Sequence, residues 1–398
     1  MEYTIKTINE LCTKITDGSH FSPEHETDGL YPMYSVKDME YNNFSNADCK
    51  MIGQAMFDKL SKADCRPLKN DILIAKDGSY LKCAFKVNED LNACILSSIA
   101  ILRPNLKNID PDYFVYLMRT KSIKGAMANY VSGSALPRII LSDFKKMKLK
   151  MILSLPTQQK IASILSAYDN LIQNYKKQIE ALQTAASELY KEWFVRFRFP
   201  GYQTTKFENG IPEGWKVEKL FDVAKIIYGY PFNSDEFCDD STLNPVVRIR
   251  DILDNHTDTY TSESCDEKYW INPNEMLIGM DGIFHMTLWT GERALQNQRT
   301  VRVTSKVRNL SNYYLYFSLY PQIKALEQMI VGTTVAHLGD KHLKKITILI
   351  PEDKILKMSY EKLEPMMNRI YSLQQQITNL TQQRNLLLPR LMSGKLEV

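Results

Sequence analysis

The sequence has few of the signals that usually identify a secreted protein or a metalloprotein. Its seven cysteines include no Cys-x-x-Cys pair, so neither a disulfide framework nor a zinc knuckle is expected. Its six histidines never adopt a His-x-x-x-His or His-Glu-x-x-His spacing, which disfavours a zinc site. No apolar stretch approaches the roughly 20 residues that span a bilayer, and the first residues have no signal-peptide core. We therefore expect a protein of the reducing cytoplasm that binds no metal.

Motifs for phosphate and nucleotide chemistry are absent as well. There is no Gly-x-x-x-x-Gly-Lys-Ser/Thr loop and no Gly-x-Gly-x-x-Gly after a strand, which disfavours nucleotide-binding enzymes. The Asp/Asn-Pro-Pro-Tyr/Phe motif of methyltransferases that act on exocyclic base amines is also missing. One alternative is a metal-dependent nuclease, because Asp112, Asp143 and Lys145 fit a Pro-Asp … Asp-x-Lys pattern. Its counterpart, His342-Leu-Lys344, lacks the first carboxylate, so we predict no catalytic residue.

A large excess of charge of one sign is missing too. The 398 residues include 50 Lys plus Arg and 46 Asp plus Glu, a net charge of +4, which excludes a strongly basic, histone-like binder. The hydrophobic content of 44% and charged content of 24% are those of an ordinary globular chain. A chain of this length is expected to form two or three domains.

The sequence does contain an internal repeat with a period of about 200 residues. Four blocks recur in the same order. They are Pro32–Met39 and Pro245–Ile252; Asn70–Gly78 and Asn274–Gly282; Tyr113–Leu117 and Tyr313–Phe317; and Gly133-Ser134 with Phe144–Met147, matched by Gly332-Thr333 with Leu343–Ile346. Each repeat joins a body of short apolar runs, typical of strands, to a long helical tail. The predicted fold class is therefore α+β, with two similar bodies.

The two tails carry the heptad pattern of a coiled coil. Apolar residues alternate at steps of four and three from Ile161 to Trp193 and again from Leu363 to Leu391, where Arg384 interrupts them. Pro365 indicates that the second helix begins or kinks there. The predicted helix–helix seam consists of Leu165, Ile172, Ile179, Leu182, Leu189, Ile370, Leu373, Ile377, Leu380 and Leu387.

An antiparallel pairing of the tails would bury both apolar stripes. A helix of about 30 residues measures roughly 45 Å, more than the 34 to 36 Å or so of one DNA turn, so the pair would suit a spacer between two readers. The predicted division is a body at residues 1–155, a central helix at 156–199, a second body at 200–352 and a C-terminal helix at 353–398.

Charge is unevenly distributed within each body. Residues 78–150 hold 12 basic and 5 acidic side chains, a net +7, and residues 282–351 hold 9 and 3, a net +6. The preceding segments, 1–77 and 200–281, carry net charges of −4 and −9. Two matched basic segments suit DNA, because neutralising phosphates releases counterions. The alternative is a coiled-coil scaffold whose basic faces are merely solvated.

Side chains suited to base edges lie in or near these segments. Arginines such as Arg138, Arg293, Arg299 and Arg302 can fork onto guanine, and Gln296, Asn297 and Gln298 can pair with adenine. The predicted DNA-binding residues are His20, Lys37, Lys76, Ser79, Tyr80, Lys82, Ser134, Arg138, Arg248, Arg250, His285, Thr287, Arg293, Gln296, Gln298, Arg299, Thr333, His337 and Lys341.

Taken together, the chain resembles the specificity subunits of type I DNA restriction and modification systems. The resemblance covers essentially all 398 residues. It rests on the order body, helix, body, helix; on Leu155-Pro-Thr-Gln-Gln-Lys-Ile-Ala-Ser-Ile-Leu165; on Ile211-Pro-Glu-Gly-Trp215; and on the Gly-Ser/Thr blocks at Gly133 and Gly332. The second helical opening, Pro351-Glu-Asp-Lys-Ile-Leu-Lys357, departs from the Gln-Gln-Lys-Ile form.

The resemblance implies a non-catalytic subunit with two target recognition domains, each reading one half of a split, asymmetric sequence in double-stranded DNA. The antiparallel helices would set the unread spacer and dock two modification subunits, which bind S-adenosylmethionine and methylate adenine. Restriction subunits would join them to cleave DNA with ATP and Mg²⁺. This chain itself would bind no cofactor.

Overall fold

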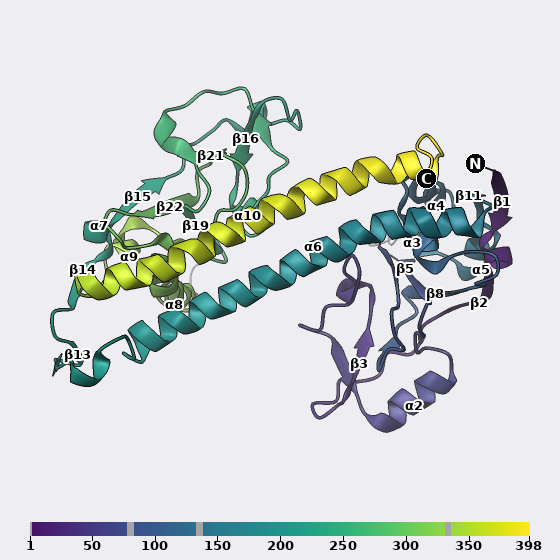
Figure 1. Ribbon diagram of the computed structural model, residues 1–398, viewed down its shortest axis with the longest axis horizontal. Coiled ribbons are helices and arrows are strands. Elements are labelled where there is room, and N and C mark those ends of the chain that lie inside the picture. The colour runs from purple at the N-terminus through teal and green to yellow at the C-terminus, as the bar shows by residue number, and fades with distance from the viewer. Residues whose placement is uncertain (1, 78–82, 133–137, 331–335) are drawn as a thin grey trace. The chain divides into compact units, whose positions relative to one another are not determined.

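The computed structural model describes residues 2–77, 83–132, 138–330 and 336–398. The chain forms two compact units, residues Met1–Leu171 with Leu380–Val398, and residues Ile172–Asn379. Each unit contains one body of strands and short helices together with a segment of each long helix, α6 in teal and α10 in yellow (Figure 1). Because both helices pass from one unit into the other, the first unit combines the two ends of the sequence, whereas the second unit is one continuous segment.

The first unit has a mixed body in which short strands and helices alternate. Its elements are β1 (Tyr3–Thr7), α1 (Ile8–Leu11), β2 (Cys12–Asp17), β3 (Tyr31–Tyr34), η1 (Val36–Asp38), β4 (Lys50–Ile52), α2 (Gln54–Lys62), β5 (Ile72–Ala75), β6 (Ala84–Lys86), β7 (Cys94–Ile95), β8 (Ile99–Pro104), α3 (Pro111–Arg119), α4 (Lys121–Ala128), β9 (Val131–Ser132), β10 (Arg138–Ile139), α5 (Leu141–Lys146), β11 (Lys148–Ile152) and the start of α6 (Leu155–Tyr190).

The second unit repeats this order with small differences. After α6 and a π-helical turn, η3 (Lys191–Val195), come β12 (Phe207–Glu208), β13 (Ile211–Pro212), β14 (Lys216–Lys219), α7 (Leu220–Val223), β15 (Ala224–Tyr228), β16 (Asn244–Val247), η6 (Ile249–Asp251), β17 (Tyr260–Thr261), β18 (Trp270–Ile271), β19 (Met276–Gly279), β20 (Met286–Leu288), β21 (Ala294–Gln296), β22 (Thr300–Ser305), α8 (Asn312–Ile330), α9 (Asp340–Leu343), β23 (Thr347–Ile350) and α10 (Asp353–Met392).

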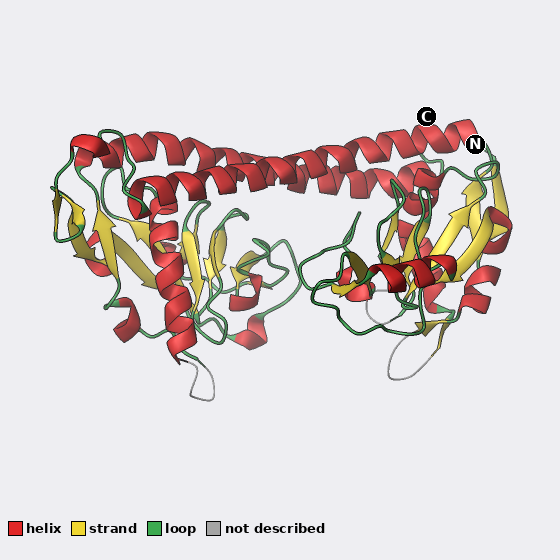
Figure 2. Cartoon of the chain, turned by 90° about the horizontal axis from the view of Figure 1, so that it is seen from below, coloured by secondary structure: helices red, strands yellow, loops and turns green. Residues whose placement is uncertain are grey.

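The sheets show that the two bodies are copies of one fold. The order β2-β8-β5-β6 in the first unit corresponds to β15-β22-β19-β20 in the second, and the ribbon β1-β11 corresponds to β14-β23. Each unit also contains one parallel pair, β3 with β7 and β16 with β21. Figure 2 shows the strands of each unit lying on one side of its long-helix segments. The predicted α+β class with an internal repeat is confirmed.

The structure corrects one of the predicted repeat alignments. At the start of α3, Asp110 Oδ1 accepts a hydrogen bond from the Tyr113 amide at 2.9 Å, and at the start of α8, Ser311 Oγ accepts one from the Tyr314 amide at 3.0 Å. The Tyr113 and Tyr314 hydroxyls both bond to the backbone of the last strand of their body. Tyr113 is therefore equivalent to Tyr314, one residue beyond the predicted Tyr313.

Two glycines occupy equivalent points of close backbone approach. A Cβ built on Gly18 would lie 2.1 Å from the Ile95 carbonyl oxygen, and one on Gly229 would lie 1.9 Å from the Asn297 carbonyl oxygen. Each glycine directly follows the edge strand, β2 or β15. No other residue type fits without moving the backbone, so these glycines fix where the following loop leaves the sheet.

The long helices pack against each other in antiparallel fashion within each unit. In the first unit, Ile161 and Leu165 of α6 share a core with Leu391 and Met392 of α10. In the second unit, the other end of α6 shares a core with the first half of α10. The predicted seam residues are all buried or half-buried: Leu165, Ile172, Ile179, Leu182, Leu189, Ile370, Leu373, Ile377, Leu380 and Leu387.

Helix α10 does not begin at Pro365, as one predicted alternative had it. It begins at Asp353 and continues through the proline, although Pro365 has no amide hydrogen to donate to the preceding turn. Ile355 and Leu356 are both buried in the core of the second unit. Their burial outweighs the single hydrogen bond that is lost, so the helix extends N-terminal to the proline.

Arg384 interrupts the heptad pattern because it belongs to a buried charged layer in the first unit. Its guanidinium contacts the carboxylate of Asp169 on α6, which also lies 3.4 Å from the guanidinium of Arg119 and accepts a hydrogen bond from the Tyr116 hydroxyl at 2.8 Å. Both guanidinium carbons lie over the Tyr41 ring, at 3.9 and 4.5 Å from its centroid. Desolvation and the nearby carboxylate raise the pKa of Tyr116. This layer ties α3, α6 and α10 together.

Two further features concern the cysteines and the long helices. All seven cysteines lie among the described residues and carry free thiols; burial raises the pKa of Cys94 to about 11 and that of Cys12 to about 12. Among the helices that the structure describes, none is both long and apolar enough to cross a bilayer.

Candidate nucleic-acid interface

In the first unit, predicted DNA-binding residues gather around the ends of β2 and β5. Asp77, two residues beyond β5, forms an isolated antiparallel bridge with Arg138, and its Oδ1 lies 3.2 Å from Arg138 Nε. The neighbouring Asp17, at the end of β2, lies 3.3 Å from both His20 Nε2 and Lys76 Nζ. These ion pairs bring two acidic and three basic side chains from three separate segments into one cluster.

The second unit has an equivalent cluster in which an aspartate contacts different side chains. Asp281, two residues beyond β19, forms the matching antiparallel bridge with His337. Its Oδ1 lies 2.7 Å from His337 Nδ1, and its Oδ2 lies 3.2 Å from Arg299 Nη1. Arg299 adopts a positive φ of 69° in the turn between β21 and β22. Both side chains are at least half-exposed, with side-chain exposures of 50% for His337 and 60% for Arg299.

A second pair of predicted residues, Lys37 and Arg250, also occupies equivalent positions. Both are exposed and lie in the short helices η1 and η6. Asp38 and Asp251 cap these turns by accepting hydrogen bonds from the Ser35 amide at 2.7 Å and the Arg248 amide at 2.9 Å. Burial raises the pKa of Asp251. The turns hold both cations outward by the same local construction.

Three predicted contacts are not at the surface. The Lys76 side chain is 3% exposed because its ammonium is ion-paired inside the body with Asp17. Gln296 is fully buried, and its amide donates to the Ile227 and Thr300 carbonyl oxygens at 3.0 and 3.2 Å. Arg302 is 4% exposed in the inner strand β22, where it is ion-paired with Glu275 at 2.6 Å. These side chains are held by partners inside the bodies in this structure, and their contact with DNA stays a prediction.

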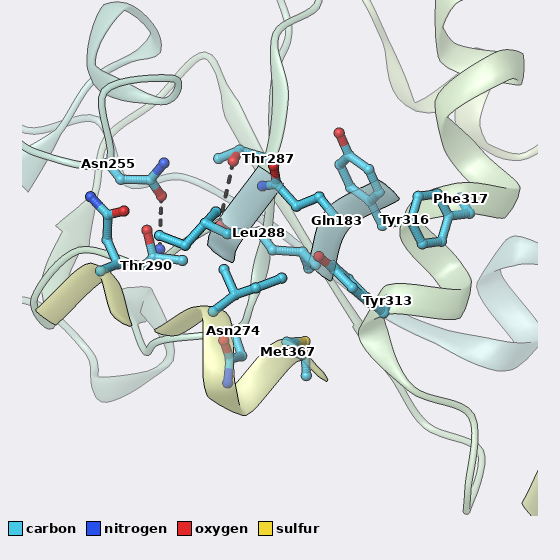
Figure 3. Close-up of a pocket in the computed structure, with 13 residues that line it drawn as sticks. Gln183, Asn255, Asn274, Thr287, Leu288, Thr290, Tyr313, Tyr316, Phe317 and Met367 are labelled. Carbon is cyan, nitrogen blue, oxygen red and sulfur yellow. Dashed lines mark hydrogen bonds between the residues drawn. The ribbon is translucent and has the colours of Figure 1, made fainter. Parts of the chain in front are cut away.

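Thr287 faces a pocket beside the long helices. The pocket, of about 320 Å³, is lined by Thr287 and Thr290 of the body, Gln183 of α6, and Tyr313 and Tyr316 of α8, as Figure 3 shows. The Thr287 hydroxyl donates to the Leu288 carbonyl oxygen at 3.4 Å. Thr287 therefore lines a pocket that is bounded by α6, α8 and α10.

The other predicted DNA-binding residues remain predictions. Gln298 and Lys341 are exposed, and His285 and Arg248 are half-buried. Arg293 is ion-paired with Glu267 and stacks over the Trp270 ring. Ser79, Tyr80, Lys82, Ser134 and Thr333 lie outside the described residues.

The nuclease pattern finds no support in the geometry. Asp112 is ion-paired with Lys86 at 2.7 Å, and Asp143 lies 3.8 Å from Lys146 on its own helix. Within the described ranges, no three His, Cys, Asp or Glu side chains gather in a way that could hold a metal ion. Each carboxylate has an ordinary lysine partner.

The Gln-Gln-Lys-Ile motif has a structural explanation. Gln158 is fully buried; its amide nitrogen donates to the Ile152 carbonyl oxygen at 2.7 Å, and its Oε1 accepts from the Asp110 amide at 2.9 Å. One side chain thus joins the end of β11, the start of α3 and the first turn of α6. The second repeat has no glutamine at its helical opening.

Asp77 and Asp281 are not among the predicted DNA-binding residues, because cationic and amide side chains are the usual direct ligands of guanine and adenine. The internal repeat nevertheless contains a sequence signal for both aspartates. Both aspartates stand at the same place in the repeated blocks Asn70–Gly78 and Asn274–Gly282, whose first residues both adopt a positive φ, of 69° and 67°.

Comparisons with known proteins agree with this architecture. Residues 1–184 and 212–382 match the family described as type I restriction modification DNA specificity domain. The chain is 29% identical over 304 residues to the type I restriction enzyme MjaIX specificity subunit of Methanocaldococcus jannaschii, covering 72% of this chain and 69% of that protein. It is 26% identical over 396 residues to the MjaVIII specificity subunit of the same organism, covering 94% and 88%.

A solved structure shows the same fold. The crystal structure of a type I restriction-modification system S subunit from M. genitalium superposes with a TM-score of 0.62 at 14% identity, covering 98% of this chain and 96% of that one. The matched family regions fall on the two repeats and together cover most of the sequence. The chain therefore belongs to the family of type I restriction modification DNA specificity domains.

Proposed function

We propose that this chain is the DNA-recognition subunit of a type I restriction-modification complex, in which each repeat reads one half of a bipartite, asymmetric target. The observation that carries the proposal is the duplication itself. Two bodies share one sheet order, and each is followed directly by its own long helix, α6 of 36 residues or α10 of 40. A protein with two similar readers suits a target with two separated halves.

The two half-sites should differ in sequence, because equivalent positions carry different side chains. Arg138 in the first body corresponds to His337 in the second, since each bridges the aspartate beyond the central strand. Arginine forks onto guanine, whereas an imidazole offers a single donor or acceptor on each nitrogen. Similar backbones with unlike side chains support an asymmetric target.

Each part of the chain has its own role in this function. Residues 1–155 and 200–352 form the two target recognition domains, and residues 156–199 and 353–398 form the helices that set the unread spacer and dock two modification subunits. The chain is non-catalytic, and S-adenosylmethionine, ATP and Mg²⁺ act with the modification and restriction subunits. The buried apolar seam supports a rigid spacer, because it fixes the helices against one another.

The test is to co-express the chain with its modification subunit and to map methylated adenines across a genome. We expect methylation within one asymmetric motif whose two specified halves are separated by unspecified bases. Methylation of a contiguous palindrome, or none, would contradict the proposal. Absence of salt-sensitive DNA binding by the complex would instead favour a scaffold, and DNA cleavage by the chain alone with Mg²⁺, abolished in Asp143→Ala, would favour a nuclease.

A further inference from the structure

Both repeats place a carboxylate where it holds cations at the proposed reading surface. Asp77 and Asp281 each follow a central strand by two residues and form an antiparallel bridge with a residue distant in sequence. The frame around each bridge is the same: the Ile139 amide donates to the Lys76 carbonyl oxygen at 2.9 Å, and the Leu338 amide donates to the Met280 carbonyl oxygen at 2.7 Å. Ile139 and Leu338 are both fully buried.

The aspartate recurs although its partners do not. Asp77 holds Arg138, while Asp281 holds His337 and Arg299. The preceding residue also changes, from the buried cation Lys76 to Met280. Neutralising that lysine is therefore not a role common to the two aspartates. What they share is a contact from the carboxylate to a side chain that is about half-exposed: 48% for Arg138, 50% for His337 and 60% for Arg299.

Pairing with a carboxylate favours base recognition over phosphate binding for Arg138 and Arg299. A carboxylate beside a cation cancels much of its attraction to phosphate, since the pair is close to neutral at a distance. The same contact restricts the rotamers of the cation and so fixes the direction of its remaining donors. Base edges require directed donors, whereas phosphates are satisfied by a point charge.

We propose that Asp77 and Asp281 are specificity-determining positioning residues, one for each half-site, which orient Arg138 in the first body and Arg299 and His337 in the second toward base edges. This inference rests on the proposed function. It extends that function by naming the carboxylates on which base choice depends.

The experiment selects binding sites from a randomised duplex library with the complex of this chain and its modification subunit. The chains compared are wild type, Asp77→Ala and Asp281→Ala. The matched controls are Asp143→Ala in the first body and Asp258→Ala in the second. Asp258 pairs with His256 at 3.0 Å on an exposed surface, so its removal deletes a comparable carboxylate–histidine contact. Affinity for non-specific duplex is measured for each protein.

We expect Asp281→Ala to lose about tenfold in discrimination at one or two positions of a single half-site, while the other half-site is unchanged and non-specific affinity does not fall. Asp77→Ala should do the same in the opposite half-site, and both controls should retain the wild-type motif. Unchanged preferences in both variants, or an equal loss at both half-sites, would overturn the inference. A wild-type complex that selects no bipartite motif would instead overturn the proposed function.

A conservative variant covers the case in which an alanine variant does not fold. Arg299→Lys keeps the positive charge but loses the guanidinium fork. It should relax the same half-site as Asp281→Ala, and a wild-type motif from a folded Arg299→Lys protein would equally overturn the inference.

Discussion

Gly18 and Gly229 lie at positions where even one added side-chain atom, a Cβ, would overlap the neighbouring backbone. Each glycine lies where a neighbouring carbonyl oxygen occupies the space of a side chain. The next residue then donates its amide across the same crossing, from Ser19 to the Ile95 carbonyl oxygen and from Tyr230 to the Gln296 carbonyl oxygen. The loop that carries His20 therefore leaves its sheet at a fixed point.

Replacing Gly18 by alanine should destabilise the first unit. The added Cβ would overlap the Ile95 carbonyl, and forcing the backbone apart costs about 1–3 kcal/mol. Gly125→Ala is the matched control, because a Cβ there meets nothing within 4 Å and alanine in helix α4 gains about 0.5–1 kcal/mol over glycine. The urea midpoint of unfolding is measured for both variants. A Gly18→Ala midpoint equal to that of Gly125→Ala would contradict the claim that a Cβ at Gly18 overlaps the Ile95 carbonyl.

Burial limits what could be predicted about individual site residues. The sequence supplies the residue types for DNA contact, but Arg302 and Gln296 meet their partners only after β22 and β21 are placed in separate sheets. Asp77 and Arg138 are 61 positions apart by their numbers, and nothing local to either indicates the bridge. Pairings that depend on the sheet register are inaccessible from one sequence.

Among the elements, the long helices were predicted best because a heptad pattern is local and sustained. Seam residues from Leu165 to Leu387 occupy the expected positions. Pro365 lies inside α10 rather than at its start, because Ile355 and Leu356, which precede it, are buried in the core of the second unit. Strands of two residues, such as β7 and β10, are too short to leave a periodic signal, since their existence depends on partners elsewhere in the body.

The charged layer between α6 and α10 contains two guanidiniums but one carboxylate, so removing the carboxylate should cost more stability than removing one arginine. Asp169 faces two buried guanidiniums, from Arg119 and Arg384. Asp169→Leu leaves both without a carboxylate and should cost about 3–5 kcal/mol. Arg384→Leu leaves the Asp169–Arg119 pair intact and restores the heptad, so its cost should stay below about 1 kcal/mol. Urea unfolding measures the free energy of unfolding of both variants. An equal loss of stability in Arg384→Leu and Asp169→Leu would contradict the role of Asp169 as the shared partner of both arginines.

At the scale of the whole molecule, the net charge of +4 conceals the organisation of the chain. The repeat shows that acidic and basic segments alternate twice, in step with the two bodies. Comparison of the two halves is sufficient to predict this duplication, because repeated blocks such as Pro32–Met39 and Pro245–Ile252 fall on equivalent elements, β3 with η1 and β16 with η6. The same comparison does not identify the bases that each half recognises, since these depend on the directions of side chains at the loop surfaces.

The length of the long helices is proposed to set the number of unspecified base pairs between the two half-sites. Four residues inserted after Ala185 lengthen α6 by about 6 Å, close to the rise of two base pairs at about 3.4 Å each. The bodies and their reading residues are untouched by this insertion. Any change in the recognised sequence should therefore be confined to the unspecified bases between the halves.

The most direct test of the central claim is the DNA motif selected from a randomised library by the wild-type complex and by this insertion variant. The account predicts the same two half-sites from both proteins, with one or two additional unspecified base pairs between them in the variant, since the added helix rise approaches two base pairs. An unchanged gap, or altered bases within either half-site, would contradict the view that each repeat reads one half and that the helices set the distance between them.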